Sequence, residues 1–258
     1  MNSKIKLFIL LSLILTVIAG CVSIDSLIKS GDYKKAESYC EKLKGTERLQ
    51  AFEKLANDCF EKGKYEEAAI YYEKAEKIDL SKKCSIKIAD NYFAKEDFQN
   101  AAVYYNKGEA LDKVIESYLK LAEKYYASED YQSALEYYSK AGKEEKIKEI
   151  NIKLGEIAFS KGDYEQALSF FTKTNKSDRV KATNIKLGEI AFASGDYEKA
   201  VLCFNQAGAS DKEKESYKRL AELSVAKNDL ENAIKLYEKA GQQDKVKELK
   251  KKMDQKKK

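Results

Sequence analysis

Histidine, proline and tryptophan are absent from this 258-residue sequence, and cysteine occurs only five times. The lack of histidine removes the commonest general base and a frequent metal ligand. The cysteines show no metal-ligand spacing, and the serines and carboxylates follow one internal period without a unique cluster among them. We therefore expect no catalytic residue, no bound metal and no enzyme activity.

A strong excess of one charge is also missing. The chain has 48 lysine and arginine residues against 43 aspartate and glutamate residues, which gives a formal net charge of +5. For a sequence in which 35% of the residues are charged, this is close to balance. Composition therefore does not predict nucleic acid as a partner.

A long apolar run occurs once, at Leu7–Ala19, after Lys4 and Lys6. The run has the length of a signal-peptide core and is too short for a comfortable membrane span. It ends in Ile-Ala-Gly-Cys, which resembles a bacterial lipobox. The resemblance implies a lipoprotein signal peptide at residues 1–20 and lipidation of Cys21. An ordinary signal peptide with a chance cysteine, or an uncleaved anchor, is the alternative.

The lipobox resemblance also implies a place in the cell. Diacylglycerol and acyl chains such as palmitate would be attached covalently to Cys21, and we expect no other cofactor. The protein would be a membrane-anchored lipoprotein of a bacterial envelope. In a Gram-negative type of cell, Val22 is compatible with the outer membrane or cell surface, and otherwise the plasma membrane is expected.

The rest of the chain repeats with a period of 33 residues after a first step of 32. Between Asn151–Tyr164 and Asn184–Tyr197, 12 of 14 residues are identical. One large residue marks each repeat, at Tyr33, Tyr65, Phe98, Tyr131, Tyr164, Tyr197 and Leu230. An alanine follows each marker after three residues, and an aromatic residue or a cysteine follows after seven. Residues at these offsets lie along one face of a helix, and they are called here the stripe.

A second helical pattern precedes each marker. It carries a large aliphatic residue followed by glycine or alanine, as in Leu154-Gly155 and Leu220-Ala221. We expect the small residue to let two helix backbones approach closely. Each repeat is then a helix hairpin that cannot bury its apolar side alone, so neighbouring hairpins must stack.

These residues resemble the tetratricopeptide repeat family. The leucine–glycine pair, the turn Gly162-Asp163-Tyr164, Ala167 and the aromatic Phe171 appear in the order of that family. The resemblance covers roughly residues 24–241. It implies an all-α, right-handed solenoid of seven helix hairpins over 21–243, with a lysine-rich capping helix and tail at 244–258. The family's repeat is usually one residue longer and contains a proline, so the superhelical pitch stays open.

Without proline, other residues must end and start the helices. We predict left-handed glycines after the second helix of four hairpins, at Gly108, Gly142, Gly208 and Gly241. We predict helix N-caps at a fixed position after them, at Asp79, Asp112, Asp178, Asp211 and Asp244.

Four cysteines lie within the repeats. Cys40 and Cys59 fall on helices that should pack together, so they could form a disulfide in an oxidising envelope. Cysteines at such positions are more often small core residues. Cys84 and Cys203 have no evident partner.

In the resembled family, partners bind along a concave face that the first helices line. Counting back from each marker gives an aromatic row after five residues and an acidic row after eight. Spacings of three and four place these rows, and an aliphatic row further back, on one helical face. The candidate groove residues are Phe60, Asp90, Phe93, Glu123, Tyr126, Glu156, Phe159, Glu189, Phe192 and Glu222.

The sequence therefore predicts a scaffold that binds protein or peptide segments, expected to come from envelope proteins, in this groove. The competing interpretation is that the rings only pack on neighbouring hairpins and the carboxylates are solvated. Self-association as a spacer, through apolar residues at Leu27–Ile28 or on the cap, is a second hypothesis. A third is an accessory subunit whose acidic groove takes a basic ligand. Because the row is acidic, capture of chaperone C-termini by a carboxylate clamp is not expected.

Overall fold

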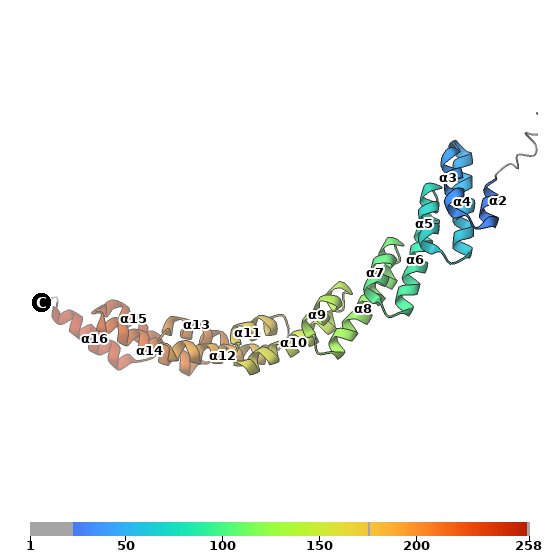
Figure 1. Ribbon diagram of the computed structural model, residues 1–258. Helices are drawn as coiled ribbons and strands as arrows, with labels where there is room; N and C mark the ends of the chain where they lie inside the picture. Colours follow the sequence, from blue (N-terminus) through green and yellow to red (C-terminus); the bar gives the residue numbers. More distant parts are fainter. Residues whose placement is uncertain (1–22, 175, 257–258) are drawn as a thin grey trace, which may run out of the picture. The chain divides into compact units, whose positions relative to one another are not determined.

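A computed structural model describes residues 23–174 and 176–256 (Figure 1). The predicted signal peptide at 1–20 and the predicted lipidation site Cys21 lie outside the described residues. Every regular element in the described part of the chain is an α-helix. None of these helices is both long and apolar enough to cross a membrane.

The helices form seven hairpins followed by one further helix. The first helices of the hairpins are α2 (Ile24–Ser30), α4 (Gly45–Glu61), α6 (Ile78–Ala94), α8 (Leu111–Ala127), α10 (Glu144–Lys161), α12 (Ser177–Ala193) and α14 (Ser210–Ala226). The second helices are α3 (Tyr33–Lys42), α5 (Tyr65–Lys74), α7 (Phe98–Lys107), α9 (Tyr131–Lys140), α11 (Tyr164–Thr172), α13 (Tyr197–Ala207) and α15 (Leu230–Lys239). The last helix is α16 (Gln243–Lys256). The predicted all-α repeat fold is confirmed, and its handedness stays a prediction.

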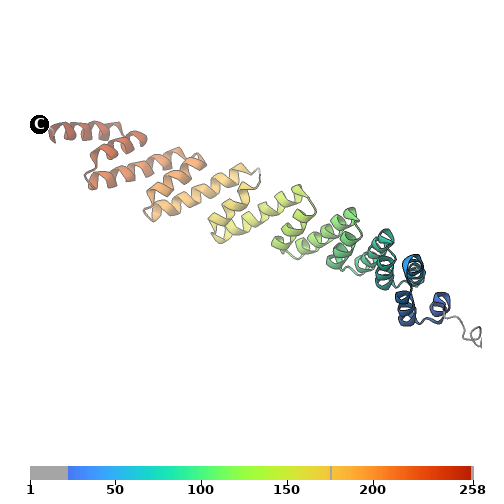
Figure 2. The same cartoon turned by 90° about the horizontal axis from the view of Figure 1, so that it is seen from above.

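The chain divides into two compact units, and the division falls inside α8, between Leu121 and Ala122. In the N-terminal unit, each helix from α2 to α7 packs on the next one along the chain. In the C-terminal unit, the same holds from α9 to α16. Figure 2 shows the successive helices of the C-terminal unit, such as α12 and α13, side by side. Within each unit, stacking therefore follows the order of the sequence.

The predicted stripe forms the core of each hairpin. The alanine three residues after each marker is completely buried, at Ala36, Ala68, Ala101, Ala134, Ala167, Ala200 and Ala233. The residue seven after the marker is also buried in all seven hairpins, at Cys40, Tyr72, Tyr105, Tyr138, Phe171, Phe204 and Tyr237. Burial of this stripe is the hydrophobic term that holds the two helices of a hairpin together.

The small residue of the first helix makes room for a ring rather than for a backbone. A Cβ atom on Gly188 would lie 2.6 Å from Cε1 of Phe204, and one on Gly155 would lie equally close to Phe171. Hairpins with alanine at this register carry tyrosine opposite, as in Ala56 with Tyr72, Ala89 with Tyr105, Ala122 with Tyr138 and Ala221 with Tyr237. The expected close approach of two backbones is therefore replaced by a ring packed over glycine.

The predicted N-caps are wrong by two residues. Asp79, Asp112, Asp178, Asp211 and Asp244 each occupy the second position of a helix. The reason is that the chain re-enters a helix almost at once: Glu76 is left-handed, Lys77 is the N-cap and Ile78 begins α6. The aspartates still lie in the first turn, where a negative charge favours the helix dipole.

Ser23 caps the first helix α2, and the other side-chain caps belong to the second helices, which sequence reading missed. The aspartate before each of six markers accepts a hydrogen bond from the backbone N–H three residues later, at 3.0–3.2 Å. These aspartates are Asp32, Asp97, Asp130, Asp163, Asp196 and Asp229. The recurrent Asp directly before the marker was the signal that could have identified them.

Three of the four predicted left-handed glycines are confirmed: Gly142, Gly208 and Gly241 have φ of 66°, 70° and 71°. The prediction for Gly108 is wrong, because its φ is −80° and Glu109 takes the left-handed conformation instead. A Cβ on Gly108 would lie 2.5 Å from Cγ1 of Ile86. Glycine is needed there for contact with α6, not for its dihedral freedom.

The cysteines within the repeats are buried free thiols. Burial raises the pKa of both Cys40 and Cys59 to about 11. Cys40, Cys59 and Cys84 all belong to the core of the first hairpins. In this structure they serve as small apolar side chains, and the alternative of a disulfide between Cys40 and Cys59 is not realised.

Candidate functional site

The rings of the predicted aromatic row are held by their own hairpins. Each lies edge-on against the marker ring five residues later, with centroids 5.0–5.5 Å apart and planes inclined by 64–76°. The rings are Phe60, Phe93, Tyr126, Phe159 and Phe192, and all are half-buried. This edge-to-face contact fixes one side of each ring. Each ring also keeps part of its surface exposed on the first helix.

Carboxylates of the acidic row form ion pairs with bases on the neighbouring hairpin. Asp90 Oδ1 lies 2.7 Å from Lys113 Nζ, and Glu189 pairs with Lys212. In each case the base is 23 residues downstream, on the first helix of the next hairpin. The Lys212 ammonium, helped by Lys186, holds the pKa of Glu189 below its ordinary value. These carboxylates are therefore ionised and paired.

Of the remaining members of the acidic row, one follows the same pattern and one pairs within its own helix. Glu156 Oε1 lies 2.8 Å from Nη2 of Arg179, again 23 residues downstream. Glu222 lies 3.1 Å from Arg219 on its own helix. Glu123 lies on the exposed side of α8. The predicted groove residues are thus found on the expected helices, but the carboxylates that pair in this way do not form an uncompensated negative surface.

A basic row accompanies the acidic row, and sequence reading missed it. Eleven residues before each marker from the second hairpin to the seventh stands Lys54, Lys87, Lys120, Lys153, Lys186 or Arg219. Lys186 lies 3.0 Å from Glu189, and Lys54 lies 3.0 Å from Asp25. Counting back from each marker, which located the acidic row, could also have found this basic row. Its presence makes the first-helix face alternate in charge.

Tyrosine hydroxyls tie the hairpin core to this face. Tyr105 donates to Asp90 Oδ1 at 2.8 Å, and Tyr72 donates to Asn57 Oδ1 at 2.6 Å. Burial acts to raise the pKa of Asp90, but Lys113 and the Tyr105 hydroxyl together hold that pKa below its ordinary value. Phe171 and Phe204 occupy the same register without a hydroxyl.

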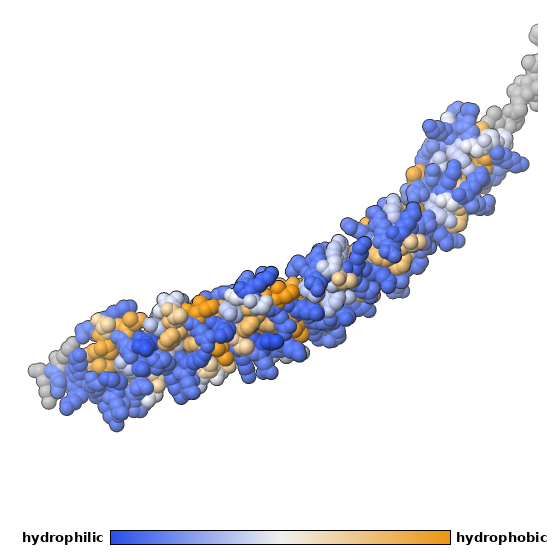
Figure 3. Space-filling model, turned by 60° about the horizontal axis from the view of Figure 1, so that its bottom comes forward, coloured by the Kyte–Doolittle hydropathy of each residue, from blue (hydrophilic) through white to orange (hydrophobic). Residues whose placement is uncertain are grey.

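The C-terminal unit contains a recess where this hydroxyl is missing. Glu189, Phe192, Phe204, Lys212 and Glu215 line a cavity of about 250 Å³ on α12, α13 and α14. Phe204 is 2% exposed and forms the floor, while Phe192 is half-buried. Figure 3 shows hydrophobic residues reaching the surface among hydrophilic ones on one face of the molecule.

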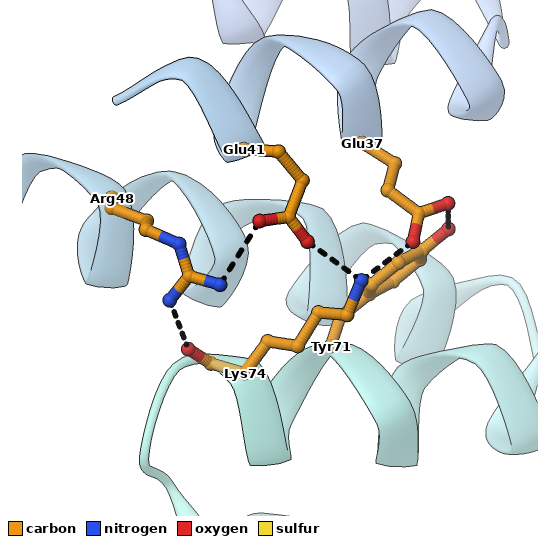
Figure 4. Close-up of polar contacts among 5 residues, drawn as sticks. All are labelled: Glu37, Glu41, Arg48, Tyr71 and Lys74. Carbon is orange, nitrogen blue, oxygen red and sulfur yellow. Dashed lines mark hydrogen bonds and ion pairs between the residues drawn. The ribbon is translucent and has the colours of Figure 1, made fainter. Parts of the chain in front are cut away.

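A dense polar cluster lies away from the predicted groove, in the N-terminal unit (Figure 4). Lys74 Nζ is 2.7 Å from Glu37 and 2.9 Å from Glu41, and Arg48 Nη2 is 3.1 Å from Glu41. The cations of Arg48 and Lys74 also lie 4.8 and 5.2 Å from the centroid of the Phe52 ring. The charges compensate each other and connect α3, α4 and α5, so this cluster strengthens the first hairpins. Across the described residues, no group of side chains could hold a metal ion.

Comparison with known proteins places these features in a family. Models of a family described as tetratricopeptide repeat match residues 49–82, 119–178 and 185–245, together more than half of the chain. No curated protein matches the sequence.

Several solved structures are similar to the chain at low identity. One is the TPR2AB-domain:pHSP90 complex of yeast Sti1, at 17% identity over 82% of this chain and 97% of that chain, with a TM-score of 0.24. BtubC from P. vanneervenii is 16% identical over 90% and 93%, with a TM-score of 0.22. The C-terminal part of a TPR repeat-containing protein from Cytophaga hutchinsonii is 18% identical over 84% and 92%, with a TM-score of 0.21.

Proposed function

The chain belongs to the tetratricopeptide repeat family, and we propose that it is an adaptor that holds protein partners at a bacterial envelope membrane. The observation that carries the proposal is the aromatic row on the first helices. Its rings are fixed by their markers and remain partly exposed. Rigid, half-buried aromatic rings can supply much of the binding energy of an interface.

The charge pattern supports selectivity in this groove. A partner segment meets carboxylates and bases that alternate along each first helix and are mostly paired. An apolar anchor on a ring needs little charge rearrangement. A segment with the wrong charge spacing would place like charges together, which disfavours binding. The groove therefore suits a segment with apolar anchors between charged residues.

The membrane anchor is proposed from the sequence alone, as lipid on Cys21 after removal of residues 1–20. It is tested by growth of cells that express the chain with labelled palmitate. The proposal predicts label and membrane association for the natural chain and loss of both for Cys21→Ser. Equal membrane association of the two chains would reject lipidation as the anchor.

The groove is tested by co-purification from native membranes. The bait is the full chain, compared with the triple variant Tyr126→Ala, Phe159→Ala and Phe192→Ala. A matched control replaces three exposed apolar residues of second helices, Ile70, Val103 and Leu202, by alanine. Circular dichroism checks that both variants fold.

The adaptor proposal predicts defined partners that the natural chain and the control retain and that the groove variant loses. Purified partner must then bind the purified chain directly. If all three baits retain the same proteins, the aromatic row is structural and the proposal fails.

The hypothesis of a self-associating spacer gains no support from the chain ends. Leu27 and Ile28 are partly buried and pack on the first core, contrary to the exposure that the hypothesis needs. In α16, Val246 and Leu249 are buried against the last hairpin. The apolar residues that were to join two copies are thus used within one chain.

A further inference from the structure

Two sites in the C-terminal unit occupy the same register, two repeats apart. The first, called here the tyrosine site, consists of Glu123, Tyr126, Tyr138, Lys146 and Glu149. The second, called here the phenylalanine site, consists of Glu189, Phe192, Phe204, Lys212 and Glu215, which line the recess of about 250 Å³. Position by position, the two sets differ only by the replacement of both tyrosines with phenylalanine.

The tyrosine site supplies its own donors. The Tyr126 hydroxyl donates to Glu149 Oε1 at 2.7 Å, and Lys146 Nζ lies 2.9 Å from the other oxygen of that carboxylate. Lys146 and Lys153 lie 6.0 and 5.7 Å from the centroid of the Tyr126 ring. The carboxylate is thus satisfied at short range, and the ring already has cations near its face.

The phenylalanine site lacks the tyrosine hydroxyls, and its cations are placed differently. Lys212, the counterpart of Lys146, pairs with Glu189 rather than with Glu215. Glu215 contacts only Lys218 at 3.3 Å and Arg219 at 3.4 Å, both on its own helix. These contacts are longer than ordinary charge-assisted hydrogen bonds. The Lys212 ammonium lies 5.7 Å from the centroid of the Phe204 ring, and among the described residues no cation lies over the ring of Phe192.

We propose that the phenylalanine site binds the side chain of a lysine or arginine from the partner segment. The aliphatic stem would cover Phe204 and Phe192, and the cation would lie over the Phe192 ring and donate to Glu215. This one side chain supplies the donor and the cation that the tyrosine site provides for itself. The inference rests on the proposed function, because it names what the groove recognises at this hairpin.

Other occupants fit less well. An acidic side chain would add a third carboxylate beside Glu189 and Glu215 and would bring no donor to either of them. A purely apolar side chain would cover Glu215 without giving it a donor, and this desolvation is unfavourable. The recess is also below the size range of ordinary small-molecule pockets, which favours a single side chain.

The test uses two probes with the same stem, Nα-acetyl-lysine amide and Nα-acetyl-norleucine amide. Each is titrated into the isotope-labelled full chain and followed by NMR. The proposal predicts saturable shifts at Gly188, Phe192 and Glu215 with the lysine probe and at least tenfold weaker binding of the norleucine probe. Equal binding of both probes, or no shift with lysine at tens of millimolar, would overturn it.

Two double variants, which exchange phenylalanine and tyrosine between the sites, are matched to each other. Phe192→Tyr with Phe204→Tyr copies the tyrosine site, and it should abolish the lysine-dependent shifts while the chain stays folded. Tyr126→Phe with Tyr138→Phe copies the phenylalanine site, and it should add a second set of shifts around Glu149. If the first pair keeps the natural affinity, the recess is not where the cation binds and the proposal is rejected.

The outcome separates this inference from the adaptor proposal. Partners that depend on the aromatic row, together with no lysine binding, would leave the adaptor intact and reject the cation site. Lysine binding without any groove-dependent partner would support the cation site and reject the adaptor proposal. The variant Glu215→Gln gives a third readout, because it keeps the shape of the recess and should weaken the lysine probe at least fivefold while leaving the norleucine probe unchanged.

Discussion

Glu156 on α10 and Arg179 on α12 lie 2.8 Å apart across two successive hairpins. The equivalent contact joins Asp90 to Lys113 in the N-terminal unit. The acidic row therefore supplies the carboxylate of a repeated ion pair, called here the clip, and the following hairpin supplies its base. The carboxylates of one first helix look like an acidic surface in the sequence. Bases from the next hairpin neutralise this charge when the hairpins stack.

The clip between Glu156 and Arg179 should contribute little to stability. Both side chains are about half exposed, at 48% and 51%, so solvent screens the attraction. A double-mutant cycle with Glu156→Ala and Arg179→Ala, measured by urea unfolding, should give a coupling of about 0.2–1 kcal/mol. The coupling should shrink in high salt. A coupling well above that range would mean that the clip has a larger structural role than its exposure allows.

Gly188→Ala should destabilise the fold. Helix propensity alone predicts a gain of about 1 kcal/mol for alanine. The new Cβ would however lie 2.6 Å from Phe204, and overpacking costs about 1–3 kcal/mol. We expect a net loss in urea unfolding that the second change Phe204→Leu partly restores. A more stable Gly188→Ala variant would show that the ring moves aside freely.

Asn151→Leu should stabilise the chain. Asn151 is 2% exposed, and its amide donates to the carbonyl oxygen of Ile147 at 2.8 Å. Its Oδ1 atom is buried without a partner, as is that of Asn184. Removing an unsatisfied buried acceptor should raise the free energy of unfolding by about 1–2 kcal/mol. Loss of stability would instead show that a bound water satisfies the oxygen.

The buried thiols should make stability fall at high pH. Because burial raises the pKa of Cys40 and Cys59 to about 11, both thiols stay neutral in the folded chain while they ionise near pH 9 when unfolded. Their contribution is complete below about pH 9 and is lost as pH rises towards 11. The Tm of Cys40→Ala with Cys59→Ala should fall less over this interval than that of the natural chain. A parallel fall of both would assign the effect to other groups.

Labelling gives an independent check of the same burial. At pH 8, a thiol reagent should modify Cys40 and Cys59 only after urea has unfolded the N-terminal unit. Fast modification of the folded chain would contradict their burial.

The repeat length predicted the fold because each hairpin must bury the same stripe. Tyr164, Ala167 and Phe171 identified the stripe, and the structure buries the alanine and the second ring completely or nearly so. Helix starts were harder to predict, because Asp79 and Asp163 are both good capping residues and only the second one caps a helix. The choice depends on how quickly the backbone turns after the previous helix, which local composition does not determine.

The site could be predicted only in part. Counting placed Phe159 and Glu156 on one face of α10, but it did not show that Glu156 binds Arg179. That contact depends on how far one hairpin is displaced from the next, which is a property of stacking. The recess at Phe204 has a clear sequence signal, the change from Tyr138 at the equivalent position. Its meaning becomes apparent only when the contacts of the surrounding charges are known.

Site-specific photocrosslinking in native membranes tests the central claim most directly. Benzoylphenylalanine is introduced at position 159, on the aromatic row, or at position 202, which is 64% exposed on a second helix. The adaptor account predicts defined crosslinked partners from position 159 and none of these from position 202. Crosslinks to the same proteins from both positions, or from position 202 alone, would contradict binding in the groove.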